Sequence, residues 1–186
     1  VIRRETAAAL RGDRVDDPAF QALQALALRH RLDERWPMEL VSGFAMDVDG
    51  RRYESLPEVL EYCWGVAGVV GVMMAKIMGA DTAETLRRAQ DLGLAFQLTN
   101  ICRDIVEDAR AGRVYLPAET LKARGAPLSA EDLARERLRE AEFAAALDLL
   151  GLAESYYTSS RQGLRALPFR AAVAVAAARD VYRAIG

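Results

Sequence analysis

Two acidic residues stand one helical turn apart just past the middle of the chain, in the stretch QLTNICRDIVEDARAGRVYLP at 97–117. Like charges at this spacing destabilise an isolated helix by roughly 0.2–0.5 kcal/mol. At about 100° per residue, Asp104 and Asp108 share one face of a helix with the amides of Gln97 and Asn100. Apolar residues occupy the rest of this helix, which predicts that much of it is buried. A buried acidic stripe needs cations to compensate its charge.

The chemistry that fits this stripe is the binding of a metal and a phosphate. Carboxylate and amide oxygens are ligands that Mg²⁺ prefers, usually together with water and a substrate phosphate. Glu107 lies beside the stripe and could ligate the metal or orient water, while Arg103, Arg113 and Tyr115 supply donors for phosphate oxygens. These parts suggest a diphosphate held by magnesium at the mouth of an apolar cavity. The alternative is a solvated helix end that carries ordinary charge pairs.

A second unusual segment is YCWGVAGVVGVMM at 62–74, in which Gly65, Gly68 and Gly71 are spaced three apart. Each glycine inside a helix costs about 1 kcal/mol relative to alanine. Glycines allow the close approach of another helix or of a ligand, and the spacing alone leaves both alternatives open. Tyr62 precedes them by about one turn and is either a polar tip at the edge of an apolar tunnel or a core tyrosine.

Helical periodicity runs through nearly the whole chain, interrupted by glycine and proline. Ser55 and Glu58 form a predicted capping box. No segment alternates with the period of a strand, so the predicted architecture is an all-α bundle. The expected helices are Val1 to Arg11, Pro18 to about Arg31, Pro37 to near Asp47, Leu56 to Met78, Asp81 to about Arg110, a short helix near 118–124, Ser129 to about Leu150 with continuation to Arg165, and a last helix from Pro168.

The composition fits one domain over residues 1–186, with 52% apolar and 28% charged residues. A net charge of −2 creates no field that would attract nucleic acid or an anionic membrane. Cys63 and Cys102 lie in apolar helical context and are interpreted as buried thiols in a reducing cytoplasm. His30 is the only histidine, so Ser-His-Asp catalysis would need it as the base. The longest uncharged stretch, Trp64 to Ala75, is too short to span a bilayer.

The segment DVDG at 47–50 lacks the later ligand positions of a calcium loop and predicts a turn. Asp47 itself ends a helix and could face the same cavity as the stripe. The chain starts at Val1 rather than at a methionine and ends at Gly186 within a helical pattern, so we expect it to be part of a longer protein.

Several long motifs together resemble the squalene/phytoene synthase family, and its bacterial phytoene synthases in particular. The resemblance covers essentially the whole chain and implies the class I isoprenoid synthase fold, a helical bundle around an apolar cavity. It also implies the head-to-head joining of two geranylgeranyl diphosphates to phytoene, with Mg²⁺-dependent loss of diphosphate, in carotenoid biosynthesis. The motifs are GFAMDV (43–48), LEYCWGVAGVVGVMMAKIMG (60–79), DLGLAFQLTNICRDIVEDARAGRVYLP (91–117), AESYYTSSRQGLRALP (153–168) and DVYRAIG (180–186).

The resemblance assigns roles to the residues singled out above. Asp104 and Asp108 would bind Mg²⁺, or Mn²⁺ in its place, with Glu107 beside them. Tyr62 would be the catalytic tyrosine near the developing cation. The resemblance implies no requirement for NADPH. The expected substrate-binding residues are Gln97, Asn100, Arg103, Arg113, Tyr115 and Gly68.

One departure from the family pattern opens alternatives. The family's first aspartate-rich motif and its final helix do not occur in these residues, and DRVDD at 13–17 lies in a loop and does not replace the motif. One alternative function is squalene or dehydrosqualene synthesis from farnesyl diphosphate. The other is a non-catalytic helical subunit that binds prenyl diphosphates. We expect a cytoplasmic protein whose membrane-soluble product makes peripheral membrane contact plausible, and the sequence leaves the oligomeric state open.

Overall fold

The computed structural model describes residues 1–135 and 139–186. Within these two ranges all regular structure is helical, which confirms the predicted all-α architecture. The elements are α1 (Ile2–Arg11), α2 (Pro18–His30), α3 (Arg35–Val48), α4 (Leu56–Cys63), the π-helical turn η1 (Trp64–Gly68), α5 (Val69–Ile77), α6 (Ala83–Arg103), α7 (Ile105–Arg110), α8 (Ala118–Ala123), α9 (Ala130–Leu133), α10 (Glu140–Ser160), the 3₁₀ segment η2 (Arg161–Ala166) and α11 (Phe169–Ile185).

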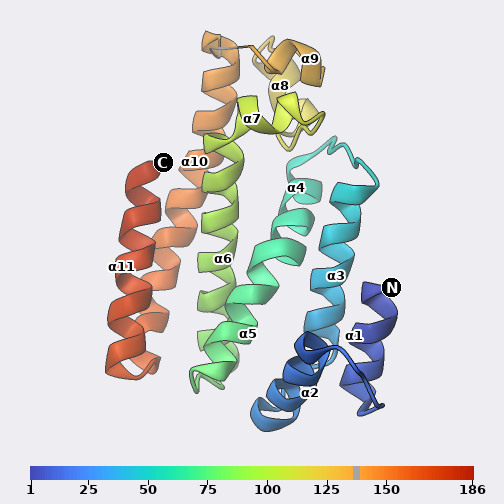
Figure 1. The fold of residues 1–186 in the computed structure, drawn as a ribbon. Helices are drawn as coiled ribbons and strands as arrows, with labels where there is room; N and C mark the ends of the chain where they lie inside the picture. The colour runs from blue at the N-terminus through green and yellow to red at the C-terminus, as the bar shows by residue number, and fades with distance from the viewer. Residues whose placement is uncertain (136–138) are drawn as a thin grey trace.

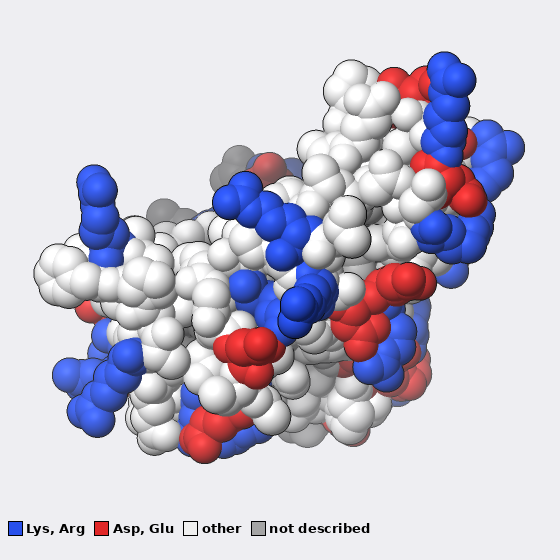
Figure 2. Space-filling view, turned by 90° about the horizontal axis from the view of Figure 1, so that it is seen from below, with Lys and Arg blue, Asp and Glu red and all other residues white. Residues whose placement is uncertain are grey.

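The long helix α6 is the centre of the arrangement (Figure 1). It packs against α10 and α11 on one side and against η1 and α5 on the other, with α3 beyond them. The short helices α7, α8 and α9 gather at the upper end in Figure 1, and α1 and α2 lie next to the lower half of α3. Seen from below, positive and negative side chains are intermixed over the surface rather than separated by sign (Figure 2).

The tightest packing joins α6 to α10. Ala95 and Leu98 of α6 and Ala145 and Leu149 of α10 are all fully buried. Small alanine side chains let two helices approach closely while leucines fill the space between them. The central helix is therefore fixed along one face, and its polar stripe is held in place by this packing.

The helix predicted from Leu56 to Met78 exists as one continuous helical run, Leu56–Ile77, that contains the π-helical turn of η1. It ends before Gly79, whose φ of 95° suits glycine. By length and composition this 22-residue run, with a mean hydropathy of 1.4, could cross a membrane, and 44% of its most apolar window is buried within the protein. The uncharged stretch from Trp64 to Ala75 is shorter than the helix itself, because the helix continues past charged residues at both ends.

The predicted capping box at the start of this helix does not form, because neither of its two hydrogen bonds is present. The Glu58 carboxylate accepts a hydrogen bond from the backbone N–H of Glu54 at 2.7 Å, whereas the Ser55 side chain makes no capping bond. The backbone N–H of Leu56 instead donates to the carboxylate of Glu119 at 2.7 Å. A residue distant in the sequence thus replaces the local cap.

The next predicted helix, Asp81 to Arg110, is wrong at its start and in its continuity. Thr82 is the capping residue, since its hydroxyl accepts from the N–H of Thr85 at 3.2 Å, and Asp81 pairs with Lys76. The helix breaks at Asp104, whose φ of −104° and ψ of 14° leave the helical region. The predicted single helix is therefore α6 followed by α7.

The predicted helix from Ser129 to Leu150 is also divided. Ser129 does cap a helix, accepting from the N–H of Asp132 at 3.1 Å, but that helix is only the short α9. A new helix, α10, begins at Glu140, where the Glu142 carboxylate accepts from the N–H of Arg139 at 2.6 Å. Residues 136–138 of the predicted helix lie outside the described residues.

Three other helix starts agree closely with expectation. Asp17 caps α2 through a bond from the N–H of Ala19 at 2.8 Å, as its sequence predicts. Pro37 lies in the first turn of α3, and Pro168 directly precedes α11. Side-chain capping therefore accounts for the starts of α2, α6 and α9, whereas α1, α3 and α11 begin without a side-chain cap.

Candidate functional site

The break between α6 and α7 lies within the polar stripe predicted from the sequence. The N–H of Asp108 still bonds to the carbonyl of Asp104 at 2.8 Å, so one helical turn separates the two carboxylates in spite of the break. Their side chains are half-buried, with exposed fractions of 27% for Asp104 and 22% for Asp108. Gln97 and Asn100, further back on α6, are also partly buried. The predicted stripe therefore exists in the fold.

Two arginines accompany these carboxylates. The Arg103 guanidinium donates two bonds to Asp104, at 2.7 and 2.6 Å, and Arg113 lies 3.6 Å from Asp108. Both arginines are more than 40% exposed. Exposed ion pairs contribute little net stability, so a phosphate could exchange for the carboxylate partner at small cost. Glu107 is exposed and lies at the rim.

The electrostatics around Asp108 favour an added cation. Burial raises the pKa of the Asp108 carboxyl, and the negative charges of Asp104, Glu107 and Asp47 raise it further, against a lowering by Arg113. Carboxylates that disfavour their own ionised form are stabilised by a positive ion. In the described part of the chain, no group of three acidic, histidine or cysteine side chains is close enough to enclose a metal ion. A magnesium ion here would need further oxygens from water or phosphate, which is its common mode.

Asn100 supplies an independent sign that a ligand fits. Its side-chain nitrogen donates to the side-chain Oε1 of Gln97 at 3.4 Å, while its own Oδ1 is buried and has no hydrogen-bond partner among the described residues. Buried acceptors without partners are uncommon in folded proteins. An amide oxygen beside two carboxylates is a hard donor set that suits Mg²⁺, so the residues present fit that ion.

An aromatic cluster lies next to the stripe and centres on Asp47, at the end of α3. Its carboxylate accepts from the Tyr62 hydroxyl at 3.2 Å and from the Tyr115 hydroxyl at 2.7 Å. The rings of Tyr62 and Tyr115 stack with centroids 4.8 Å apart, and Tyr53 packs against both. The sequence indicated only that Asp47 could face the cavity, and it did not predict Tyr53 as part of the site. The GFAMDV motif, which contains Asp47, was the signal that could have identified this residue.

The phenols of this cluster stay protonated at neutral pH. Burial is the main cause that raises the pKa of Tyr115 to about 12, and it raises the pKa of Tyr62 and Tyr53 as well. The nearby Asp47 carboxylate raises all three further, because a second negative charge is disfavoured there. Tyr62 is thus a neutral hydroxyl with a fixed partner.

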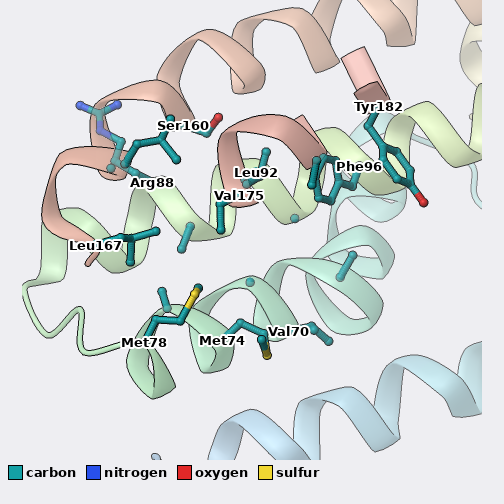
Figure 3. A pocket seen from close by; sticks show the side chains of 18 of the residues that line it. Val70, Met74, Met78, Arg88, Leu92, Phe96, Ser160, Leu167, Val175 and Tyr182 are labelled. Carbon is teal, nitrogen blue, oxygen red and sulfur yellow. The ribbon is translucent and has the colours of Figure 1, made fainter. Parts of the chain in front are cut away.

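A cavity of about 550 Å³ begins beside Gln97 and Asn100 and runs between α5, α6, η2 and α11. Figure 3 shows Phe96 and Tyr182 at one end and Met78, Leu167 and Arg88 at the other. Apolar side chains such as Val70, Leu92 and Val175 line its middle. An apolar cavity with polar groups at its mouth is suited to an amphipathic ligand.

Tyr182 connects this cavity to the polar mouth and was not predicted as a site residue. It lines the cavity, and its ring lies 4.5 Å from that of Phe96. The Asp104 carboxylate, and more weakly Tyr182, raise the pKa of Arg103. The motif that contains Tyr182, DVYRAIG, contributed to the family resemblance, but no residue spacing in the sequence predicted that α11 would lie against α6.

The spaced glycines act chiefly in helix packing. A Cβ on Gly71 would come within 2.4 Å of the Ala89 carbonyl oxygen, and one on Gly65 would lie 3.1 Å from the Gly43 Cα. Gly68 is buried against Trp64 and Leu94 and does not line the cavity, and its expected role in substrate binding stays a prediction. Only Gly71 of the three also borders the cavity.

The fold and the site together define a class: an all-helical protein with an apolar cavity that two amides border at one end, next to a stripe of carboxylates and arginines around the junction of α6 and α7. The sequence matches the squalene/phytoene synthase family over residues 1–186, and the chain belongs to that family. The structure is similar to that of the squalene synthase HpnC from Alicyclobacillus acidocaldarius, with a TM-score of 0.88 and 25% identity over 98% of this chain and 68% of that one.

Two curated relatives are similar over the whole chain. The 15-cis-phytoene synthase of Paracoccus sp. is 51% identical over 100% of this chain, and the phytoene synthase of Pseudescherichia vulneris is 50% identical over the same share. This chain spans 59% of the length of each of these relatives.

Proposed function

We propose that the protein joins two molecules of geranylgeranyl diphosphate head to head to form phytoene, with loss of diphosphate, as a step of carotenoid biosynthesis. Identity of about half to two phytoene synthases over the whole chain supports this reaction. The observation that carries the proposal is that Gln97 and Asn100 border a 550 Å³ apolar cavity, with the carboxylates of Asp104 and Asp108 one and two helical turns beyond Asn100. Such a site suits a substrate with an anionic head and a hydrocarbon chain.

In this proposal the polar mouth binds the diphosphate. Arg103 and Arg113 are half-exposed and exchange their carboxylate partners for phosphate oxygens. Asp104, Asp108 and the free Oδ1 of Asn100 would hold magnesium, with Glu107 at the rim. Magnesium, when bound, would neutralise diphosphate charge and make the diphosphate a better leaving group.

The apolar cavity has two tasks in the same proposal. It binds the hydrocarbon chain, and it excludes the water that would otherwise capture an allylic cation. Tyr62, whose hydroxyl is fixed by Asp47, presents a neutral oxygen near the mouth rather than a charged nucleophile that the cation would alkylate. The proposed reaction contains no reduction and therefore uses no NADPH. We further propose a cytoplasmic location with peripheral membrane contact during product release.

The test is to incubate the full-length protein with geranylgeranyl diphosphate, with Mg²⁺ or with a chelator, and to identify the products by mass. The expected result is magnesium-dependent release of diphosphate together with phytoene, unchanged by NADPH. Release of a single-chain alcohol, or turnover that is equally fast with chelator, would contradict the proposal.

A second candidate is the synthesis of squalene or dehydrosqualene from farnesyl diphosphate, which the structural similarity to a squalene synthase favours. Competition between farnesyl and geranylgeranyl diphosphate in one incubation separates the two by product length. Binding of both diphosphates by the full-length protein without any product would instead indicate the non-catalytic binding subunit.

A further inference from the structure

The far end of the cavity contains a charged residue that the proposed reaction does not use. Arg88 of α6 lines the cavity together with Met78 and Leu167, at the end opposite Tyr182 (Figure 3). Its aliphatic stem borders the cavity, and its guanidinium points toward the junction of α10 and η2. A charged group at the bottom of an otherwise apolar cavity needs an explanation.

The guanidinium is held by side chains from two helices. It donates to the Ser159 hydroxyl at 2.5 Å and to the Glu84 carboxylate at 3.0 Å. Ser159 in turn donates to Asp91, which is only 6% exposed. The side chains of Arg88 and Asp91 are 14% and 9% exposed, whereas that of Glu84 is 69% exposed, so the network is buried on the Ser159 side and open to water at Glu84.

The stem of Arg88 is fixed as well. Gly163, in η2, leaves no space for a larger residue, because a Cβ there would lie 2.7 Å from the Arg88 Cβ. The Nε of Arg88 is buried and has no acceptor among the residues that the structure describes. Moving this side chain would therefore require the α6, α10 and η2 contacts to break together. The SSRQG part of the AESYYTSSRQGLRALP motif, Ser159 to Gly163, supplies most of this enclosure.

The position of Arg88 matches the length of one chain. Arg88 and Asn100 lie on the same helix, about 18 Å apart at a rise of about 1.5 Å per residue. The hydrocarbon core of a bilayer is about 30 Å thick, so one lipid chain extends about 15 Å. A single prenyl chain whose head is at Asn100 would end near Arg88.

We propose that Arg88 is a specificity-determining residue that sets the longest prenyl chain the cavity accepts; this inference rests on the proposed function. A longer chain would have to displace a guanidinium held by Ser159 and Glu84, with Asp91 behind it. Pushing hydrocarbon against this guanidinium breaks its hydrogen bonds to Ser159 and Glu84 without replacing them, so electrostatics as well as volume oppose a longer chain at this end.

The test is a competition between geranylgeranyl diphosphate and its next longer homologue, geranylfarnesyl diphosphate, in the full-length protein. The variant Arg88→Met keeps the stem and removes the charge, and Arg88→Ala also removes the volume. Both are expected to increase the relative kcat/KM for the longer substrate, Arg88→Ala on the order of tenfold. The matched control is Arg29→Ala, since Arg29 is exposed on α2 and neither lines the cavity nor contacts the Arg88 network.

Folding and the underlying reaction are controlled separately. Ser159→Ala removes one partner of the guanidinium while the Arg88 stem stays in place. It should also raise the relative kcat/KM for the longer substrate, but by less than the Arg88 variants do. If the Arg88 variants do not fold, this variant tests the proposal. Unchanged selectivity in folded variants overturns this inference alone. If the wild-type protein converts no prenyl diphosphate, both the inference and the proposed function fail.

Discussion

The two ends of α6 carry the same kinds of side chain in opposite arrangements. At the C-terminal end, Arg103 and Asp104 form a pair that is exposed to solvent, and Asn100 keeps a free oxygen. At the N-terminal end, Arg88 and Asp91 are joined through Ser159 and are largely buried. Exposed pairs beside surplus acids can exchange partners with a ligand, whereas an enclosed network resists change. Charge alone therefore does not mark the end of α6 that can exchange a side-chain partner for a ligand; the exposure of the arginines that pair with its carboxylates does.

The largest expected effect comes from Asp108→Asn, which should lower kcat/KM by at least about hundredfold because a proposed metal ligand is lost. Turnover of geranylgeranyl diphosphate at saturating Mg²⁺ is the measurement. The matched control is Asp148→Asn, since Asp148 also pairs with an arginine, Arg124, at a more exposed position on α10, and its loss should leave turnover unchanged. Wild-type activity in Asp108→Asn would contradict the proposal that the C-terminal end of α6 binds the metal.

At the N-terminal end of α6, a substitution is expected to lower stability while leaving turnover largely intact. Asp91→Ala leaves the Ser159 hydroxyl, which supports the Arg88 guanidinium, without its acceptor and should lower the free energy of unfolding by about 2 kcal/mol. Denaturant unfolding is the measurement, and the fraction that remains folded should keep most of its turnover. A variant that unfolds like the wild type but loses activity would place Asp91 in the chemistry instead.

The third prediction uses pH. Since the pKa of Asp108 is raised in the folded protein, its ionised form opposes folding, and this cost is absent below the ordinary carboxyl pKa of about 3.9 and develops as the pH rises through the higher folded value. Without metal, Asp108→Asn should therefore melt increasingly above the wild type between about pH 4 and pH 7. Scanning calorimetry across this range measures the difference, and Mg²⁺ should reduce it at pH 7. A melting difference that shrinks as the pH rises would be inconsistent with surplus negative charge at the mouth.

The smallest effect is expected from Glu107→Gln. Glu107 is exposed at the rim, so its loss should lower turnover by only about twofold to fivefold, as for a group that acts through solvent. Steady-state kinetics over a range of Mg²⁺ concentrations measures it. A loss as large as that of Asp108→Asn would show that Glu107 is a direct ligand, as the sequence suggested.

Much of the fold follows from local sequence, because amphipathic periodicity and capping residues act over a few positions. The stripe from Gln97 to Asp108 was predictable for the same reason: its residues share one face of one helix. The break at Asp104 was not, because the local pattern continues smoothly through it. The bridging of Tyr62 and Tyr115 by Asp47 and the Arg88 network join residues from distant helices, which no periodicity encodes.

The glycines show a second limit. Their spacing correctly indicated close approach, but only packing decides what approaches. Gly71 is pressed against the backbone of Ala89, and Gly68 lies against Trp64 rather than on the cavity. The sequence left helix packing and ligand binding equally open, because a glycine without a side chain allows either a helix or a ligand to come close.

The most direct test of the account is the binding of inorganic diphosphate, measured by calorimetry in the full-length protein with and without Mg²⁺. Wild type and Asp148→Asn should bind diphosphate only when Mg²⁺ is present, and Asp104→Asn and Asp108→Asn should lose most of this binding. Equal binding by all four proteins, or binding that does not depend on Mg²⁺, would contradict the assignment of this mouth as the magnesium and diphosphate site.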